Sequence, residues 1–155
     1  MSIKFVRLAA VSAAALLSAS FASADTGNLA VTANVIGTCK LVAVPPLDFG
    51  TLNQVTAPVV TPAAVNVTYR CTKNTAPATF TVGGVVSPFT GSLGNGTDNI
   101  AYTVSWTAPV TGGSGLGSGV TPVTVALTGS MAGGANYQNA SAGSYTQSVA
   151  VVITP

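Results

Sequence analysis

The chain has 155 residues, of which 48% are hydrophobic and only 5% are charged, and it contains no histidine and no glutamate. Without these residues, Ser-His-Asp and Cys-His arrangements are impossible and few general acids or bases remain, so we expect no enzymatic activity and no cofactor. High hydrophobicity with so little charge is the reverse of the composition of disordered chains, so we expect a folded protein.

Residues 1–24 have the features of a secretory signal peptide. Lys4 and Arg7 precede an apolar run from Leu8 to Leu17, and Ala22-Ser23-Ala24 matches a small-residue cleavage site. About ten apolar residues are too few to span a bilayer, which needs roughly 20. We therefore expect export, a mature chain beginning at Asp25, and no insertion into the membrane.

The side chains of the expected mature chain have no net charge. Three basic residues balance three aspartates: Lys40, Arg70 and Lys73 against Asp25, Asp48 and Asp98. Nucleic acid is therefore not an expected partner. Calcium needs roughly six to eight oxygen ligands, so Asx turns explain the aspartates better than a metal site does. A nearly uncharged surface resists association poorly, which favours a protein whose surface meets other proteins.

The first predicted strand lies in the stretch GNLAVTANVIGTC, from Gly27 to Cys39. Its apolar residues alternate along one face: Leu29, Val31, Ala33 and Val35. This period of two is typical of a strand with one buried face. Chain ends are usually poorly ordered unless something holds them. The stretch therefore fills either the core of its own domain or the core of a partner.

The same alternation predicts five further strands. They are Val65–Cys71, Ala78–Val82, Ile100–Trp106, Val123–Leu127 and Tyr145–Ile153. Clusters rich in Gly, Pro and Ser separate them and predict turns at residues 44–46, 91–96 and 112–115, while residues 111–120 are expected to form a flexible loop. No window has a helical period with helix caps. Short strands joined by such turns indicate a β-sandwich.

Cys39 and Cys71 are the only two cysteines. In an oxidising compartment this count favours one disulfide. The disulfide would close a loop of about 32 residues and add roughly 3.5–4 kcal/mol of stability in the chain-entropy model. Two free thiols or a metal site are the alternatives, although a zinc site without histidine would need carboxylates that the chain barely has.

Two large aromatic residues, Tyr102 and Trp106, lie on one face of the same predicted strand. Exposed rings in this arrangement could stack on a sugar, which would make the protein a carbohydrate-binding module. Alternating aromatic residues in a sandwich are more often part of its core. We therefore favour the core interpretation.

Four segments together resemble one known family. The run CKLVAVPPLDFGTL from Cys39 to Leu52 resembles the opening of the spore coat U domain family, the secreted pilins of archaic chaperone–usher pili and their relatives. The strand Val65–Cys71, which ends in the second cysteine, the strand Ile100–Val104 and the closing run Ala142–Val151 are similar to later parts of the family pattern. An Arg-x-Met element and a terminal aromatic residue that are common in the family are absent.

The resemblance implies an immunoglobulin-like β-sandwich over residues 37–155 that lacks its last strand. In the family, a periplasmic chaperone fills the resulting groove, and the N-terminal strand of the next subunit then replaces it during assembly at an outer-membrane usher. Residues 25–36 would be this donor segment, with Leu29, Val31, Ala33 and Val35 filling the neighbour's groove. We expect the groove to be lined by Val65, Val67, Tyr102, Val149 and Val151.

The resulting hypothesis is a structural subunit of an extracellular fibre with a role in surface adhesion or biofilm formation. Its partners would be copies of itself or related pilins, the chaperone and the usher. The alternatives are a self-contained sandwich whose own first strand is residues 27–36, a sugar-binding module, a tip adhesin, and a spore or cell coat protein.

Overall fold

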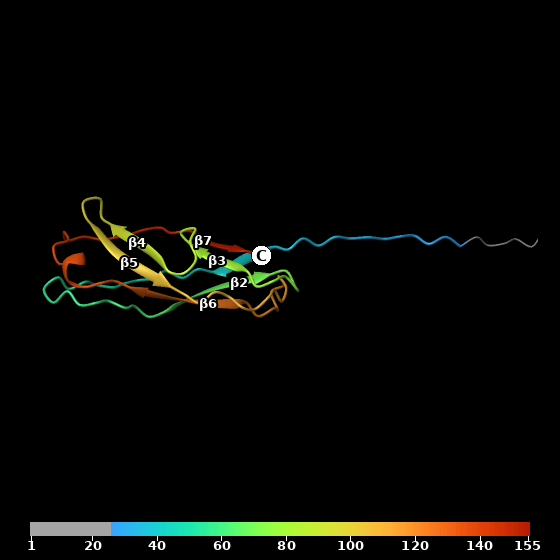
Figure 1. The fold of residues 1–155 in the computed structure, drawn as a ribbon, viewed down its shortest axis with the longest axis horizontal. Helices are drawn as coiled ribbons and strands as arrows, with labels where there is room; N and C mark the ends of the chain where they lie inside the picture. Colours follow the sequence, from blue (N-terminus) through green and yellow to red (C-terminus); the bar gives the residue numbers. More distant parts are fainter. Residues whose placement is uncertain (1–25) are drawn as a thin grey trace, which may run out of the picture. The chain divides into compact units, whose positions relative to one another are not determined.

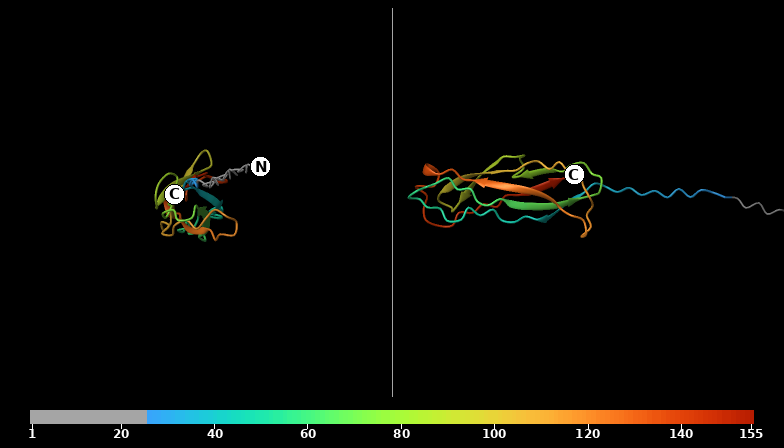
Figure 2. Two further views of the ribbon diagram at one scale, coloured as in Figure 1. Left: turned by 90° about the vertical axis from the view of Figure 1, so that its right-hand side faces the viewer. Right: turned by 90° about the horizontal axis from the view of Figure 1, so that it is seen from below.

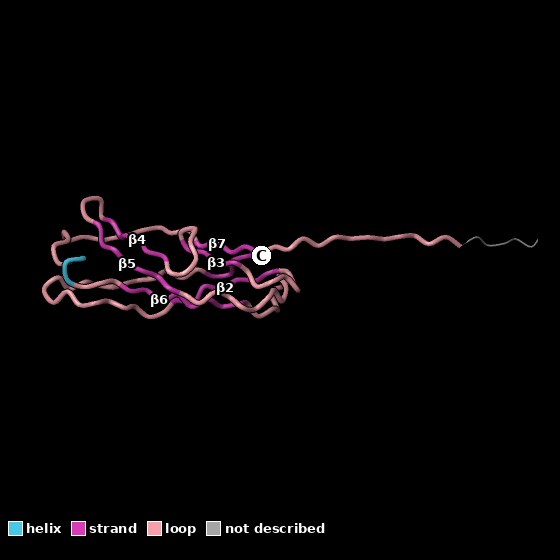
Figure 3. Tube along the Cα trace, in the orientation of Figure 1, coloured by secondary structure: helices cyan, strands magenta, loops and turns pink. Residues whose placement is uncertain are grey.

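The computed structural model describes residues 26–155, and the predicted signal peptide lies outside this range. Within it the chain is all-β, with one short 3-10 helix (Figures 1 and 3). In chain order the elements are β1 Cys39–Ala43, β2 Val65–Cys71, β3 Thr79–Val82, β4 Phe89–Gly94, β5 Asn99–Ser105, β6 Val123–Ser130, η1 Gly134–Asn136 and β7 Val151–Thr154. In this described range no helix has the length and hydropathy needed to cross a membrane.

The strands form two antiparallel sheets, which confirms the predicted all-β sandwich. The larger sheet has the order β1-β2-β6-β5-β4, and the smaller sheet pairs β3 with β7. In the right-hand view of Figure 2 the green β2 and the orange β6 run side by side, in agreement with their register from Val65 opposite Leu127 to Tyr69 opposite Val123.

The core is built from alternate residues of these strands, as the period of two requires. Buried side chains come from β2, β3, β5 and β6, including Val67, Tyr69, Phe80, Val82, Ile100, Val104, Val125 and Leu127. Phe80 packs edge-on against Trp106 with ring centroids 5.7 Å apart. Because Tyr102 and Trp106 are only 7% and 8% exposed, the core interpretation of these rings is confirmed, and neither offers a face to a sugar.

The predicted turn at residues 91–96 is wrong for its first four positions. Residues 91–94 belong to β4, which pairs with β5 from Phe89 opposite Val104 to Gly94 opposite Asn99. Gly91 serves packing rather than turning, because a Cβ there would lie 2.6 Å from Cζ of Tyr102. The turn begins at Asn95, whose Oδ1 accepts hydrogen bonds from the backbone N–H groups of residues 97 and 98.

The predicted strand Tyr145–Ile153 is shorter than expected, because this segment crosses from one sheet to the other. Thr146 forms an isolated bridge with Gly94 at the end of β4, whereas Val151–Thr154 pairs with β3. One continuous ladder cannot serve both sheets, so residues 147–150 are not in a strand. The alternation persists, since Val149, Val151 and Ile153 are all half-buried.

The first strand of the larger sheet is β1, which the sequence pattern did not single out. Cys39 and Leu41 face inward, and β1 pairs with β2 through a register shift between Leu41 and Ala43. Residues 26–38 are assigned to no strand.

Candidate functional site

The last strand, β7, has a single strand neighbour in the part of the chain that the structure describes. Its partner is β3, with Phe80 opposite Ile153 and Val82 opposite Val151 (Figure 1). β1, the edge strand of the larger sheet, lies next to β7 without forming a ladder with it. The outer sides of both strands therefore have backbone N–H and C=O groups free to pair with a further strand.

Apolar side chains beside this open edge are only half-buried. They pack against the core from two segments, one running from β1 to residue 52 and the other ending in β7, and they comprise Leu41, Leu47, Phe49, Leu52, Val149, Val151 and Ile153. Phe49 reaches the core by packing edge-on against Tyr102, with centroids 5.5 Å apart. The core is thus incompletely covered along this side of the sandwich.

The same two segments line a cleft of about 770 Å³. Residues 46–52 and Gln54 line it from one segment and residues 140–147 from the other, together with Leu93, Ile100 and Tyr137. Gln54 connects the two segments, because its side-chain amide donates to the backbone carbonyls of Tyr137, at 3.3 Å, and Ala140. Leu47, Phe49 and Leu52 belong both to this cleft and to the half-buried apolar residues. We refer to the cleft and these apolar residues together as the acceptor groove, after the role that we propose for them below.

Segment 140–147, one wall of the acceptor groove, is held by the carboxylate of Asp98. Its Oδ2 accepts hydrogen bonds from the backbone N–H of Ser141, at 2.7 Å, and from the Ser141 hydroxyl, with Tyr145 Oη more distant at 3.4 Å. These bonds, first of all those from Ser141, lower the pKa of the Asp98 carboxyl. Asp98 is therefore not in the predicted Asx turn, whereas Asp48 is, since its Oδ1 accepts from the Gly50 N–H at 2.8 Å.

The opposite edge of the larger sheet is covered by the chain itself. Gln147 Oε1 accepts hydrogen bonds from the Ser92 N–H, at 2.9 Å, and from the Tyr102 hydroxyl, at 2.8 Å. Thr146 and Gly94 exchange two backbone hydrogen bonds. The outer edge of β4 is thus occupied here, in contrast to the free sides of β1 and β7.

The chain was also compared with known protein families. The Spore Coat Protein U domain model matches residues 25–152. The chain belongs to the Spore Coat Protein U domain family. Comparison with curated proteins and with solved structures gave no significant match. Membership confirms the resemblance seen in the sequence and supports an exported, pilin-like or coat-like structural protein.

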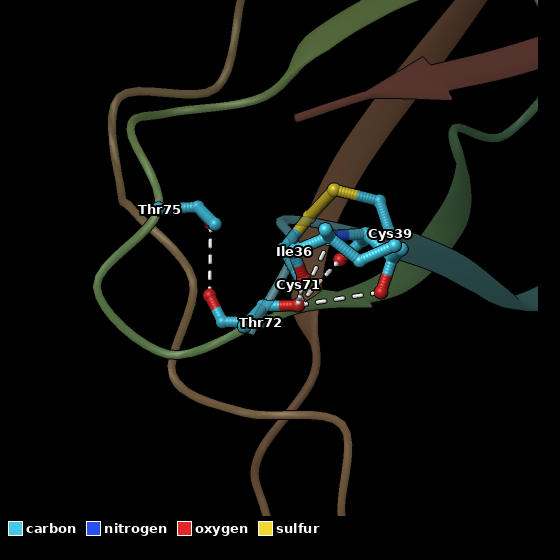
Figure 4. The surroundings of a disulfide bond; sticks show 6 residues. Ile36, Cys39, Cys71, Thr72 and Thr75 are labelled. Carbon is cyan, nitrogen blue, oxygen red and sulfur yellow. Dashed lines mark hydrogen bonds between the residues drawn. A yellow bond between two sulfur atoms is a disulfide. The ribbon is translucent and has the colours of Figure 1, made fainter. Parts of the chain in front are cut away.

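The predicted disulfide of this Spore Coat Protein U domain is present. Cys39 and Cys71 are bonded to each other and lie opposite each other in the β1–β2 ladder (Figure 4). The bond therefore joins the edge strand β1 to its neighbour β2 in the larger sheet. Among residues 26–155, no group of three His, Cys, Asp or Glu side chains could hold a metal ion.

The predicted groove residues fall into two groups in the structure. Val65, Val149 and Val151 are half-buried, whereas Val67 and Tyr102 lie inside the core, at 0% and 7% exposure. Residues that sequence reasoning missed include Leu47, Phe49 and Leu52, which line the cleft. The alternation of Leu47 and Phe49 in the PPLDFG run was the signal that could have identified them.

The predicted donor residues are exposed. Leu29, Val31 and Val35 are 88%, 84% and 79% exposed, and Ala33 is exposed as well. A row of uncovered hydrophobic side chains is an unusual feature of a protein surface, and the proposal below starts from it. Below, residues 26–35 are called the arm.

Proposed function

We propose that this Spore Coat Protein U domain is a structural subunit of an extracellular fibre, in which the arm of one copy completes the acceptor groove of the next. One observation carries the proposal: a single chain has both an exposed, alternating apolar segment and an edge strand whose free side borders an incompletely covered core. Adding a strand at such an edge is an established mode of recognition, in which backbone hydrogen bonds supply affinity and alternate side chains supply specificity.

The dimensions and energies of the two parts are compatible. The arm from Leu29 to Val35 spans about 20 Å as an extended strand. Each of its three larger apolar side chains would contribute about 1.5–3 kcal/mol on full burial. Part of this gain is offset by the cost of association and of ordering the arm. Backbone hydrogen bonds along the paired strands must therefore supply the rest of the binding free energy.

An open edge beside uncovered core also favours aggregation. A subunit of this kind therefore needs a partner before it meets its neighbour, and the family resemblance names a periplasmic chaperone and an outer-membrane usher for that step. A fibre of such subunits on the cell surface would serve adhesion or biofilm formation.

The test uses the mature chain with and without residues 25–36, each co-expressed with a periplasmic chaperone, together with a synthetic peptide of residues 25–38. The intact chain should form polymers visible by electron microscopy and size-exclusion chromatography, whereas the truncated chain should not. The peptide should bind the truncated chain and raise its melting temperature. A control peptide with Leu29, Val31 and Val35 replaced by serine should not bind.

Two results would overturn the proposal. One is an intact chain that remains a stable monomer at high concentration. The other is a truncated chain that fails to fold even with the chaperone and the peptide present. Either result would favour a self-contained sandwich, in which residues 27–36 belong to the chain's own domain.

A further inference from the structure

The chain between the arm and β1 is held although it is not in a strand. In residues 36–38, the backbone N–H of Thr38 donates to Oγ1 of Thr72 at 3.0 Å, and the Thr72 N–H donates to the Thr38 carbonyl at 2.9 Å. The Thr72 hydroxyl also lies 3.2 Å from the Thr38 carbonyl and 3.5 Å from the Ile36 carbonyl. Figure 4 shows these contacts converging on Thr72 beside the disulfide.

The arrangement is an antiparallel pair in which a side chain replaces one backbone group. Beyond the Cys39–Cys71 pair, a regular ladder would let Thr38 and Thr72 exchange two backbone hydrogen bonds. The bond from the Thr72 N–H to the Thr38 carbonyl is formed, but the reverse bond is not. The Thr38 N–H donates to the Thr72 hydroxyl instead, so this side-chain oxygen extends the pairing of the two segments by one residue pair.

The Thr72 carbonyl is not available for that reverse bond, because the chain turns away at this point. It accepts hydrogen bonds from the backbone N–H of Thr75, at 3.2 Å, and from the Thr75 hydroxyl, at 2.9 Å. The loop of residues 111–120 packs on the same turn, with Gly113 so close that a Cβ would lie 2.0 Å from the Thr72 carbonyl oxygen. This loop was expected to be flexible, yet its backbone bonds to Cys71, Asn74 and Thr75.

We propose that Thr72 is a positioning residue, whose hydroxyl fixes the root of the arm, residues 36–38, on the domain. Its role in assembly rests on the proposed function. In a fibre the root is the link between one domain and the groove of the next, because the arm would lie in the neighbour and β1 in its own domain. The hydrogen bonds of 2.9 and 3.0 Å hold the root at Thr38, so at most residues 36 and 37 can act as a linker, and the Thr72 hydroxyl thereby sets the stiffness of the fibre.

The chain offers matched variants for the test. Thr72→Val removes the hydroxyl at nearly constant shape, and Thr72→Ser keeps it. Thr75→Val is the control for the turn, because it removes one bond to the Thr72 carbonyl without touching Thr38. Near-ultraviolet circular dichroism and the melting temperature establish that each variant is folded.

Two measurements follow. In monomeric protein, hydrogen exchange at the Thr38 amide should be about fivefold faster in Thr72→Val than in wild type, because its acceptor is lost, and unchanged in Thr72→Ser and Thr75→Val. In fibres imaged by electron microscopy, the persistence length of Thr72→Val should be no more than about half that of the wild type. Fibres of Thr72→Ser should have the wild-type persistence length.

The outcomes separate the two proposals. Unchanged exchange at Thr38 in Thr72→Val overturns the positioning role whether or not fibres form. Faster exchange with unchanged fibre stiffness overturns its part in assembly and leaves the fibre proposal intact. If exchange at Thr38 is faster in Thr72→Val but the wild-type chain never polymerises, the proposed function is overturned, while the positioning of residues 36–38 by Thr72 stands.

Discussion

The substitution Val31→Asp tests the fibre proposal at the centre of the arm. Val31 is 84% exposed in the free chain, so the change should alter the stability of the monomer by no more than about 0.5 kcal/mol. In the acceptor groove the same change removes about 1.5–3 kcal/mol of apolar burial. It also takes an unpaired carboxylate out of water, which costs several kcal/mol more.

Together these losses reach at least about 5 kcal/mol, which weakens insertion of the arm by about three to four orders of magnitude. The assay is the yield of sedimentable polymer from purified protein, with melting temperature as the measure of folding. Because burial disfavours the charged form, acidification that protonates the new carboxyl should recover part of the yield.

The matched control is Thr32→Asp. Thr32 lies on the opposite face of the arm by the alternation, so the same charge should remain in water and polymer yield should stay near that of the wild type. Wild-type yield from Val31→Asp, or equal loss from both variants, would refute the assignment of Val31 to the groove.

Three further predictions concern the domain itself. Tyr69→Phe removes a buried hydroxyl that has no hydrogen-bond partner within residues 26–155, so urea unfolding should show equal or higher stability, by up to about 1 kcal/mol, and a clear loss would reveal a missed partner. Gly91→Ala should destabilise by about 1–3 kcal/mol, since its Cβ would lie 2.6 Å from the Tyr102 ring, and an unchanged melting temperature would contradict that packing. Asp98→Asn should lower the melting temperature at neutral pH; because hydrogen bonds from Ser141 depress the pKa of Asp98 in the folded state, the wild-type advantage should disappear as the pH falls through that pKa, and a pH-independent difference would argue against the carboxylate.

Several features could be read from the sequence because they are local. The alternation in Val65–Cys71 predicted β2 with its observed bounds, and the alternation around Phe80 and Val104 placed β3 and β5 to within one or two residues. The two cysteines, in a chain expected to be exported, predicted the disulfide. Each of these inferences needs only neighbouring residues or a count.

Other features required the distant parts of the chain to be brought together. Gly91 and Gly94 looked like turn residues, but residues 89–94 pair with β5, and the Tyr102 ring occupies the space that a side chain at Gly91 would need. The predicted last strand begins only at Val151, because the side chain of Gln147 bonds to β4 whereas β7 bonds to β3. Asp98 holds Ser141, 43 positions away, rather than its own turn.

The amino-acid sequence by itself predicted an all-β domain with few charges, one disulfide and an apolar arm, since composition and a period of two carry that information directly. Only the tertiary structure decided which side of the sandwich is open. An edge is open when no other strand reaches it, and that depends on every pairing in the sheet. The same reason explains the role of Thr72. Its hydroxyl accepts the hydrogen bond from the Thr38 N–H because its carbonyl already accepts hydrogen bonds from Thr75.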